Sequence, residues 1–262
     1  MLLPKRVTLE LTNRCNRKCH GCPRENMVYP IGDMSITLLT KVTSQLNSNV
    51  TIVPFYRGEA TLHHDFSGAM EHLRKFKQVQ FATNGDYLTF PHREAILRNV
   101  TFLSLSLHEF LMPWQTSWLP FLYDCLGRNI DTQVSIVDTE VDETRRGKFI
   151  SEWRQHVNRV RIYESHSKNG FGSMNNKHPT STCQKPFEDM VVYWDGKVGL
   201  CNHDWNNQTY LGNLNTQTVE EVWRSIEYEN VRSQQRLGMR TLIPTCKACS
   251  FESNKVYGEI KI

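Results

Sequence analysis

Three cysteines, Cys15, Cys19 and Cys22, lie within eight residues near the start of this 262-residue chain, in the spacing CX3CX2C. Iron–sulfur clusters are held by cysteine thiolates, normally four, so a triplet leaves one iron open to a ligand that the protein does not supply. The preceding residues 7–11 alternate apolar and polar side chains, which predicts a strand. The cysteines should then lie at the carboxyl end of that strand, where α/β sheets bind ligands. The alternative is a zinc site completed by His20 or another histidine, because Cys3His zinc sites are common.

Segments that favour strands alternate with segments that favour helices from residue 7 to residue 163. Strands are expected at residues 7–11, 51–55, 78–82, 101–107, 131–137 and 159–163. Helices are expected at residues 35–48, 65–76, 91–99, 115–127 and 142–157. This alternation predicts a parallel sheet covered by helices. The fold class is therefore α/β, with a partial (β/α)6 barrel in residues 1–164.

The last third of the chain has its own pattern. Residues 165–182 contain few apolar side chains and predict a linker, which leaves residues 183–262 as a small second domain. Residues 190–201 predict a β-hairpin turned at Asp-Gly, and a capping box of Thr218 and Glu221 predicts the start of a helix that runs on through Ile226.

This second domain carries four further cysteines, at Cys183, Cys201, Cys246 and Cys249. Four thiolates make a closed metal site with no iron open to substrate, and a zinc ribbon is the alternative to an iron–sulfur cluster. The eighth cysteine, Cys125, falls in a predicted helix and is expected to be a small buried apolar residue.

The stretch from residue 9 to residue 24, which includes LELTNRC and CPR, resembles the cluster loop of the radical S-adenosylmethionine (SAM) enzymes. The resemblance implies that Cys15, Cys19 and Cys22 hold a 4Fe-4S cluster whose open iron binds SAM, and that the reduced cluster cleaves SAM to a 5′-deoxyadenosyl radical. The C-terminal domain resembles the twitch extension of the SPASM/twitch group in this family. That likeness implies a second 4Fe-4S cluster, ligated by all four C-terminal cysteines.

The same resemblance implies residues that bind the cofactor. Gly58 and Glu59 match the glycine–glutamate motif that binds the SAM amino group, and Thr83 and Asn84 match positions that line the cofactor or substrate pocket. Ser106 matches a serine near the ribose or carboxylate of SAM. One position departs from the pattern, because Gly21 stands where the family usually has an aromatic residue next to the adenine.

A closed second cluster suits electron transfer, which predicts an oxidation. Removal of a hydrogen atom from a hydroxyl-bearing carbon gives a radical that must lose one electron and one proton to become a ketone. The cluster can accept the electron, and His166 or Arg161 is the candidate for the proton transfer. We therefore expect a dehydrogenase for a small polar alcohol such as a cyclitol or sugar. The alternatives are a maturase that modifies a ribosomally made peptide by epimerisation or crosslinking, and a non-catalytic zinc-binding module.

Composition limits the partners and the compartment. Eight cysteines in a chain without a signal-peptide-like or membrane-spanning apolar stretch are better explained by metal than by disulfides, which predicts a soluble, cytoplasmic protein. A net charge of +4 without a long basic run gives no support for nucleic-acid or membrane binding. The basic residues gathered around the first cysteines suggest docking of an acidic electron donor such as flavodoxin or ferredoxin, or a solvated loop that helps to hold an anionic cluster. These residues are Arg14, Arg17, Lys18, His20 and Arg24.

Overall fold

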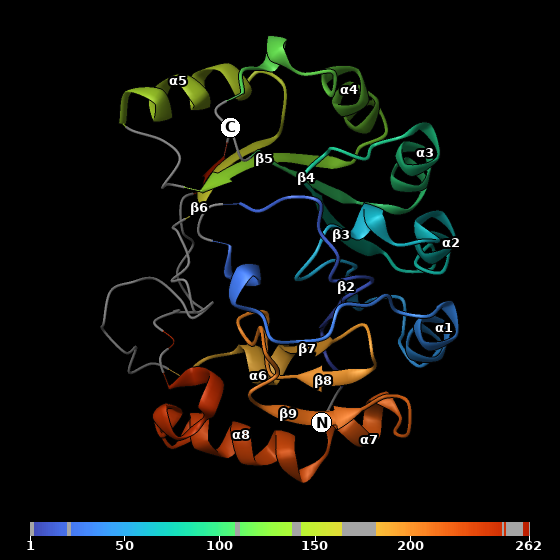
Figure 1. The fold of residues 1–262 in the computed structure, drawn as a ribbon, viewed down its shortest axis with the longest axis vertical. Helices are drawn as coiled ribbons and strands as arrows, with labels where there is room; N and C mark the ends of the chain where they lie inside the picture. Colours follow the sequence, from blue (N-terminus) through green and yellow to red (C-terminus); the bar gives the residue numbers. More distant parts are fainter. Residues whose placement is uncertain are drawn as a thin grey trace.

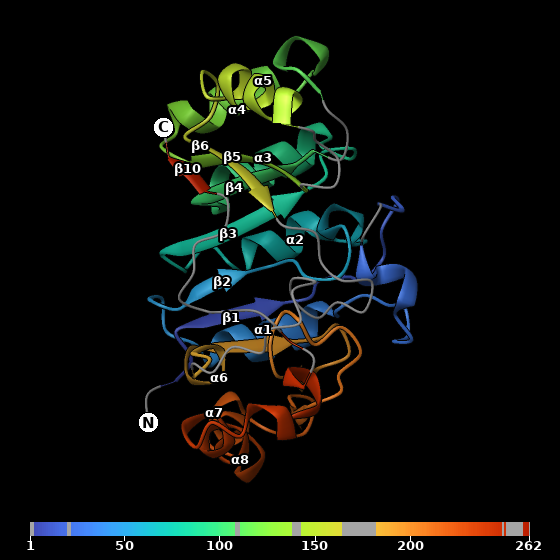
Figure 2. The same ribbon diagram turned by 90° about the vertical axis from the view of Figure 1, so that its left-hand side faces the viewer.

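The computed structural model describes residues 3–19, 22–107, 111–137, 143–163, 182–247, 249 and 259–261. Its strands form one sheet in the order β10-β6-β5-β4-β3-β2-β1-β7-β8-β9. The parallel barrel strands are β1 (Arg6–Leu9), β2 (Thr51–Val53), β3 (Gln78–Thr83), β4 (Phe102–Ser106), β5 (Asp131–Val137) and β6 (Arg159–Tyr163). Figure 2 shows these strands stacked in order from β6 to β1. The predicted α/β class and partial parallel barrel are confirmed.

Five helices connect these strands and form an arc around the outside of the curved sheet (Figure 1). They are α1 (Ile36–Ser44), α2 (Phe66–Glu71), α3 (Phe90–Asn99), α4 (Leu119–Gly127) and α5 (Glu143–Trp153). Each lies within a predicted helix or within one residue of it, but α4 begins later than the predicted residue 115. Pro120 thereby falls in the first turn of α4, where a missing backbone N–H removes no helical hydrogen bond.

Strand periodicity gives the sheet two different faces. In β4, Leu103 and Leu105 are fully buried in the hydrophobic core, whereas Ser104 and Ser106 line a cavity on the opposite face. Strands β5 and β6 repeat this alternation, because side chains two residues apart point to the same face of a sheet. The apolar face packs against the helices, and the polar face is left to form the wall of a cavity.

The C-terminal part continues the same sheet. Strand β7 (Asp189–Val192) pairs with β1 in parallel, with Val7 opposite Met190, and β8 (Lys197–Gly199) and β9 (Tyr210–Asn213) follow in antiparallel pairing. The predicted hairpin turn is confirmed at Gly196, whose φ of +85° favours glycine. Strand β10 (Glu259–Lys261) pairs with β6 at the other edge.

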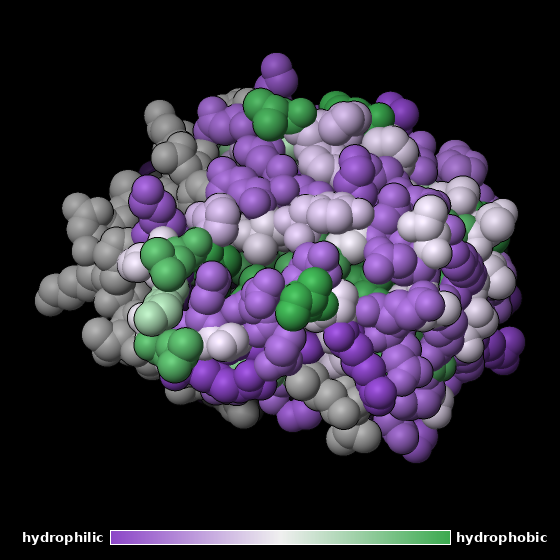
Figure 3. Space-filling model, turned by 90° about the horizontal axis from the view of Figure 1, so that it is seen from below, coloured by the Kyte–Doolittle hydropathy of each residue, from purple (hydrophilic) through white to green (hydrophobic). Residues whose placement is uncertain are grey.

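Three helices cover the C-terminal strands: α6 (Lys185–Glu188), α7 (Val219–Trp223) and α8 (Ile226–Arg236). The predicted capping box is present at Thr218 and Glu221, but the predicted single helix is two. Ser225 interrupts it, because its hydroxyl accepts a hydrogen bond from the Tyr228 N–H and caps α8. The surface seen from below, where α7 and α8 lie, is mainly hydrophilic with small apolar patches (Figure 3).

The predicted linker at residues 165–182 lies almost wholly outside the described residues, so its boundaries remain a prediction. Within the described part of the chain, no helix is both long enough and apolar enough to cross a membrane. Cys125 is completely buried in α4, as predicted.

Candidate active site

The first cysteine triplet follows β1 at the carboxyl end of the parallel strands. Cys15, Cys19 and Cys22 are all partly exposed, and the Cys22 N–H donates a hydrogen bond to the Cys19 carbonyl at 3.1 Å. Asp86, which follows the Thr-Asn-Gly stretch after β3, binds the Arg17 guanidinium with an Nε to Oδ2 distance of 2.7 Å. This contact attaches the cysteine loop to the neighbouring strand end, and three accessible thiols on one loop fit a cluster with an open iron.

Gly58 packs directly against the stem of the cysteine loop. A Cβ at this position would lie 2.5 Å from the Arg14 carbonyl oxygen and 2.7 Å from Asn13 backbone carbon. The next residue, Glu59, donates its backbone N–H to the same Arg14 carbonyl at 2.7 Å. Only glycine therefore allows the segment after β2 to approach the loop this closely.

The Glu59 carboxylate gathers two other predicted residues. It is 4% exposed and accepts hydrogen bonds from the Thr83 hydroxyl and the Asn84 N–H, both at 2.7 Å, and from the Thr61 hydroxyl at 2.8 Å. The Asn84 amide in turn donates to Asn16 Oδ1 at 2.9 Å. Glu59, Thr83 and Asn84 thus form one buried network beside the cysteine loop, and their direct contact with SAM remains a prediction.

A cavity of about 980 Å³ occupies the polar face of the sheet. Its lining includes the predicted residues Ser106 and Arg161. Both pair with Ser135 of β5, Ser106 from β4 on one side and Arg161 from β6 on the other. The Arg161 guanidinium lies 4.3 Å from the Tyr163 ring centroid. The described lining does not contain Gly58, Glu59, Thr83 or Asn84, and His166 lies outside the described residues.

The opposite side of the cavity is formed by residues that sequence analysis did not select. Asn202, His203 and Trp205 follow Cys201 directly and all line the cavity. The Tyr56 hydroxyl donates to the Cys201 carbonyl at 3.4 Å. Asn202, His203 and Trp205 lie next to a predicted cluster ligand in the sequence, and this position was the available signal. They make the segment after Cys201 part of the cavity wall.

The four C-terminal cysteines are buried, and their electrostatic influence on one another's thiols places them in one group. Burial raises the pKa of the Cys183 and Cys201 thiols, and it raises the pKa of Cys246 to about 12. Among the described residues, no three His, Cys, Asp or Glu side chains converge closely enough to hold a single metal ion. Four buried cysteines in one group supply the number of thiolates that a closed iron–sulfur cluster requires.

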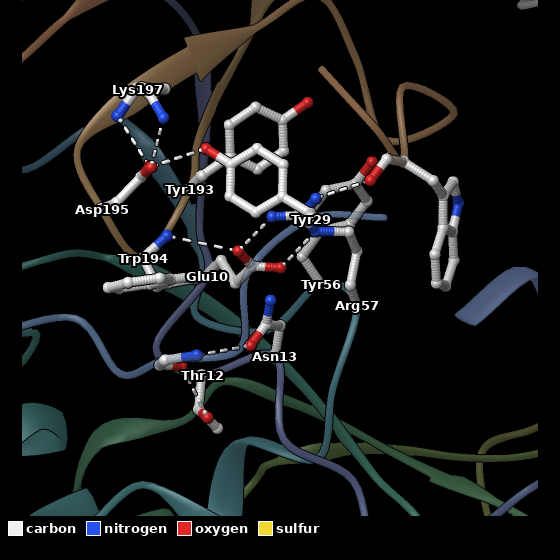
Figure 4. A network of polar contacts seen from close by, with 12 residues as sticks. Glu10, Thr12, Asn13, Tyr29, Tyr56, Arg57, Tyr193, Trp194, Asp195 and Lys197 are labelled. Carbon is white, nitrogen blue, oxygen red and sulfur yellow. Dashed lines mark hydrogen bonds and ion pairs between the residues drawn. The ribbon is translucent and has the colours of Figure 1, made fainter. Parts of the chain in front are cut away.

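A buried ion pair between Arg57 and Glu10 is the centre of a network of polar contacts (Figure 4). Arg57 forms a two-pronged contact with Glu10 at 2.6 Å for each pair of atoms, and neither side chain is exposed to solvent. The guanidinium carbon lies 4.2 Å from the ring centroids of both Tyr29 and Tyr193, and Nη1 donates to the Trp205 carbonyl at 2.6 Å. Although burial lowers the pKa of Arg57, the hydrogen bonds and charge of Glu10 outweigh it and the pKa is raised.

The aromatic rings around Arg57 remain neutral. Burial is the main cause that raises the pKa of Tyr56 and Tyr193 well above the ordinary tyrosine value, so their ring faces can contact the cation without a competing negative charge. The Tyr193 hydroxyl donates to the Asp204 carbonyl at 2.6 Å, and the Trp194 N–H donates to Glu10 at 3.2 Å. The ion pair thereby joins β1, the segment after β2 and the loop after Cys201.

These sites define an iron–sulfur protein on a partial parallel barrel, and the comparisons with known proteins agree. Residues 183–250 match the SPASM iron–sulfur cluster-binding domain. The chain is 24% identical to an S-adenosyl-L-methionine-dependent 2-deoxy-scyllo-inosamine dehydrogenase from Niallia circulans, over 93% of this chain and 92% of that protein. It is 34% identical to the subtilosin biosynthesis protein AlbA from Bacillus subtilis over 85 residues, which are 32% of this chain and 19% of AlbA.

Among solved structures, BtrN in complex with AdoMet and 2-DOIA matches with a TM-score of 0.67 and 20% identity, over 97% of this chain and 94% of that one. The comparisons support a radical SAM enzyme of the SPASM type, as the sequence predicted. They give no support for the alternative of a non-catalytic zinc-binding module.

Replacing Gly58 by Ala should lower the rate of 5′-deoxyadenosine formation at least tenfold, because the added Cβ meets backbone atoms of the cysteine-loop stem. The matched control is Gly147→Ala in α5, where an added Cβ meets no atom within 4 Å. That control should keep wild-type activity and gain about 0.5–1 kcal/mol of stability. Equal rates in the wild type and Gly58→Ala would show that the close backbone approach is not required.

Replacing Arg57 by Met should lower the free energy of unfolding by about 3–5 kcal/mol, because it leaves the Glu10 carboxylate buried without its partner. The double variant Glu10→Met/Arg57→Met should lose less than the sum of the single variants. Arg98→Met, which breaks an exposed pair with Glu94, should cost about 0.5 kcal/mol or less. Urea unfolding under anaerobic conditions measures the free energy of unfolding of Arg57→Met, Glu10→Met, the double variant and Arg98→Met. If the losses of the two single variants add up to the loss of the double variant, the pair is not coupled.

Proposed function

We propose that this enzyme oxidises a small polar alcohol of the cyclitol or sugar type, and that it uses two 4Fe-4S clusters. The carrying observation is the cavity, whose lining combines hydroxyl and guanidinium groups from the barrel strands with residues that directly follow Cys201. A substrate bound there would contact Ser135 and Arg161 while lying close to the auxiliary cluster site.

The cysteines of the first loop, Cys15, Cys19 and Cys22, would hold the SAM-binding cluster, and Cys183, Cys201, Cys246 and Cys249 would hold the auxiliary cluster. When bound, the first cluster and SAM supply a 5′-deoxyadenosyl radical, and the second cluster supplies a one-electron acceptor. The carbon that bears the hydroxyl loses a hydrogen atom, and the resulting substrate radical then loses one electron and the hydroxyl proton to give a carbonyl. Cleavage of SAM takes up one electron, and oxidation of the substrate radical releases one electron. The overall reaction therefore consumes one SAM and no net electrons.

Arg161 is suited to donate hydrogen bonds to the reacting oxygen. A guanidinium remains protonated in proteins, so it can orient the hydroxyl and favour its loss of a proton without itself being the final base. His166 remains the candidate proton acceptor. Ser135 can hold another hydroxyl group of the substrate, because a serine hydroxyl both donates and accepts hydrogen bonds. The five-residue group Gly58, Glu59, Thr83, Asn84 and Ser106 would bind SAM.

The size of the cavity favours a small substrate. Its volume of about 980 Å³ lies at the upper end of the range for small-molecule sites, about 300–1,000 Å³.

The second candidate function is modification of a ribosomally made peptide, which is supported by the partial likeness to the bacteriocin biosynthesis protein AlbA.

The electron donor would be an acidic flavodoxin or ferredoxin that docks near the first cysteine loop. Two of the predicted basic residues already contact acids, since Arg14 pairs with Asp33 at 3.3 Å and Arg17 pairs with Asp86. Lys18 is exposed on the same loop. Docking would therefore depend on fewer basic side chains than the sequence suggested.

Anaerobic reconstitution should give about eight irons per chain, four for each cluster. Cys15→Ala should abolish 5′-deoxyadenosine formation, because it removes a ligand of the cluster that binds SAM. Cys201→Ala should keep SAM cleavage but lose substrate oxidation, because it removes a ligand of the electron acceptor. Iron analysis and quantification of 5′-deoxyadenosine measure both effects. Four irons per chain together with unchanged oxidation in Cys201→Ala would contradict the two-cluster proposal.

Substrate oxidation should require Arg161. With 2-deoxy-scyllo-inosamine and related cyclitols deuterated at the hydroxyl-bearing carbons as probes, deuterium should appear in 5′-deoxyadenosine. Arg161→Met should lower ketone formation at least a hundredfold while SAM cleavage without substrate persists. The control is Arg154→Met, at an exposed residue that directly follows α5. Deuterium transfer from a labelled peptide, with none from any cyclitol or sugar, would favour the maturase instead.

A further inference from the structure

We propose that Gln235 and Arg240 are positioning residues that raise the reduction potential of the auxiliary cluster by directing N–H donors at two of its cysteine ligands. Neither residue belongs to the cysteine motif, and both lie in the segment formed by the end of α8 and the following turn, Arg240–Leu242. This inference rests on the proposed auxiliary cluster at Cys183, Cys201, Cys246 and Cys249.

The Gln235 side chain connects two ligand segments. It is 1% exposed, its Oε1 accepts a hydrogen bond from the Cys183 backbone N–H at 3.1 Å, and its Nε2 donates to Cys246 Sγ at 3.5 Å. The orientation of the amide follows from its partners, because a backbone N–H requires an acceptor and a thiolate requires a donor. Gln235 therefore fixes the first and third ligands relative to each other.

Arg240 adds a positive charge to the same site. It is 6% exposed, and its Nη2 donates to Cys249 Sγ at 3.2 Å. One buried guanidinium thus stabilises negative charge on the sulfur of Cys249.

Reduction adds one negative charge to a cluster. Hydrogen bonds to the ligand sulfurs and a nearby buried cation stabilise the reduced form more than the oxidised form, which raises the potential. A higher potential makes the cluster a better acceptor for an electron from a substrate radical. The two donors from α8 and the following turn therefore suit an auxiliary cluster whose role is to accept electrons.

The test uses the full chain with Cys15, Cys19 and Cys22 replaced by Ala, so that the auxiliary cluster alone gives the signal. Its midpoint potential is measured by anaerobic redox titration followed by electron paramagnetic resonance. Arg240→Gln and Gln235→Glu should each move the midpoint to a more negative value by at least about 59 mV, a tenfold change in the equilibrium constant for a one-electron couple. In Gln235→Glu, a carboxylate can still accept from the Cys183 N–H but replaces the donor to Cys246 with a negative charge.

The matched control is Arg236→Gln, which removes the same charge from the exposed side of α8, where Arg236 pairs with Glu229 at 2.6 Å. It should change the equilibrium constant less than twofold, because solvent screens the lost charge. Arg240→Lys, which keeps the charge but loses the planar donor group, should give a shift between wild type and Arg240→Gln, and it replaces Arg240→Gln if that variant binds no cluster.

Two outcomes separate this inference from the function on which it rests. A parent that binds about four irons, with midpoints unchanged in Gln235→Glu and in the Arg240 variants, would overturn the inference alone. A parent that binds no iron would overturn the auxiliary cluster and this inference together. Equal shifts in Arg236→Gln and Arg240→Gln would also overturn it, because the effect would then be general surface charge.

Discussion

The buried ion pair between Arg57 and Glu10 holds together the segments that carry the two cysteine sites. Isolating two charges from water is costly, and such a pair is a weak source of stability by itself. Here the cost is offset by two short hydrogen bonds and by two ring faces, those of Tyr29 and Tyr193. Because Arg57 directly precedes Gly58, the ion pair positions the segment that packs on the first cysteine loop. Its bond to the Trp205 carbonyl positions the loop after Cys201 at the same time.

Continuity of the sheet has the same effect on a larger scale. Pairing of β1 with both β2 and β7 places the strand before the first cysteines between the barrel and the C-terminal hairpin. The two cysteine sites are thus attached to neighbouring strands by backbone hydrogen bonds, not joined only through a linker. The cavity on the polar face of this sheet is lined both by barrel strands and by Asn202, His203 and Trp205, which follow Cys201.

Local patterns in the sequence were sufficient to predict the strands and to divide the cysteines into two groups, whose role as ligands stays a prediction. Period-two alternation predicted β4 to β6, and the Asp-Gly signal predicted the hairpin at Gly196, because these depend on residues close together in the chain. The Arg57–Glu10 pair and the contact of Asp86 with the cysteine loop join residues far apart in sequence, so no local pattern could indicate them. Glu59 shows the same limit. The glycine–glutamate motif identified this residue in the sequence, but only the fold showed that Thr83 and Asn84 donate hydrogen bonds to its carboxylate.

The two cysteine sites differ in exposure in a way that matches their expected chemistry. The cysteines of the first loop are partly exposed, which leaves room for SAM to reach the open iron, whereas the C-terminal four are buried and receive N–H donors from Gln235 and Arg240. A buried site with four ligands cannot bind substrate at iron, so only an electron can pass to it. In the proposed reaction the substrate radical would lose its electron in this cavity, and Asn202, His203 and Trp205 are the lining residues that lie next to Cys201 in the sequence.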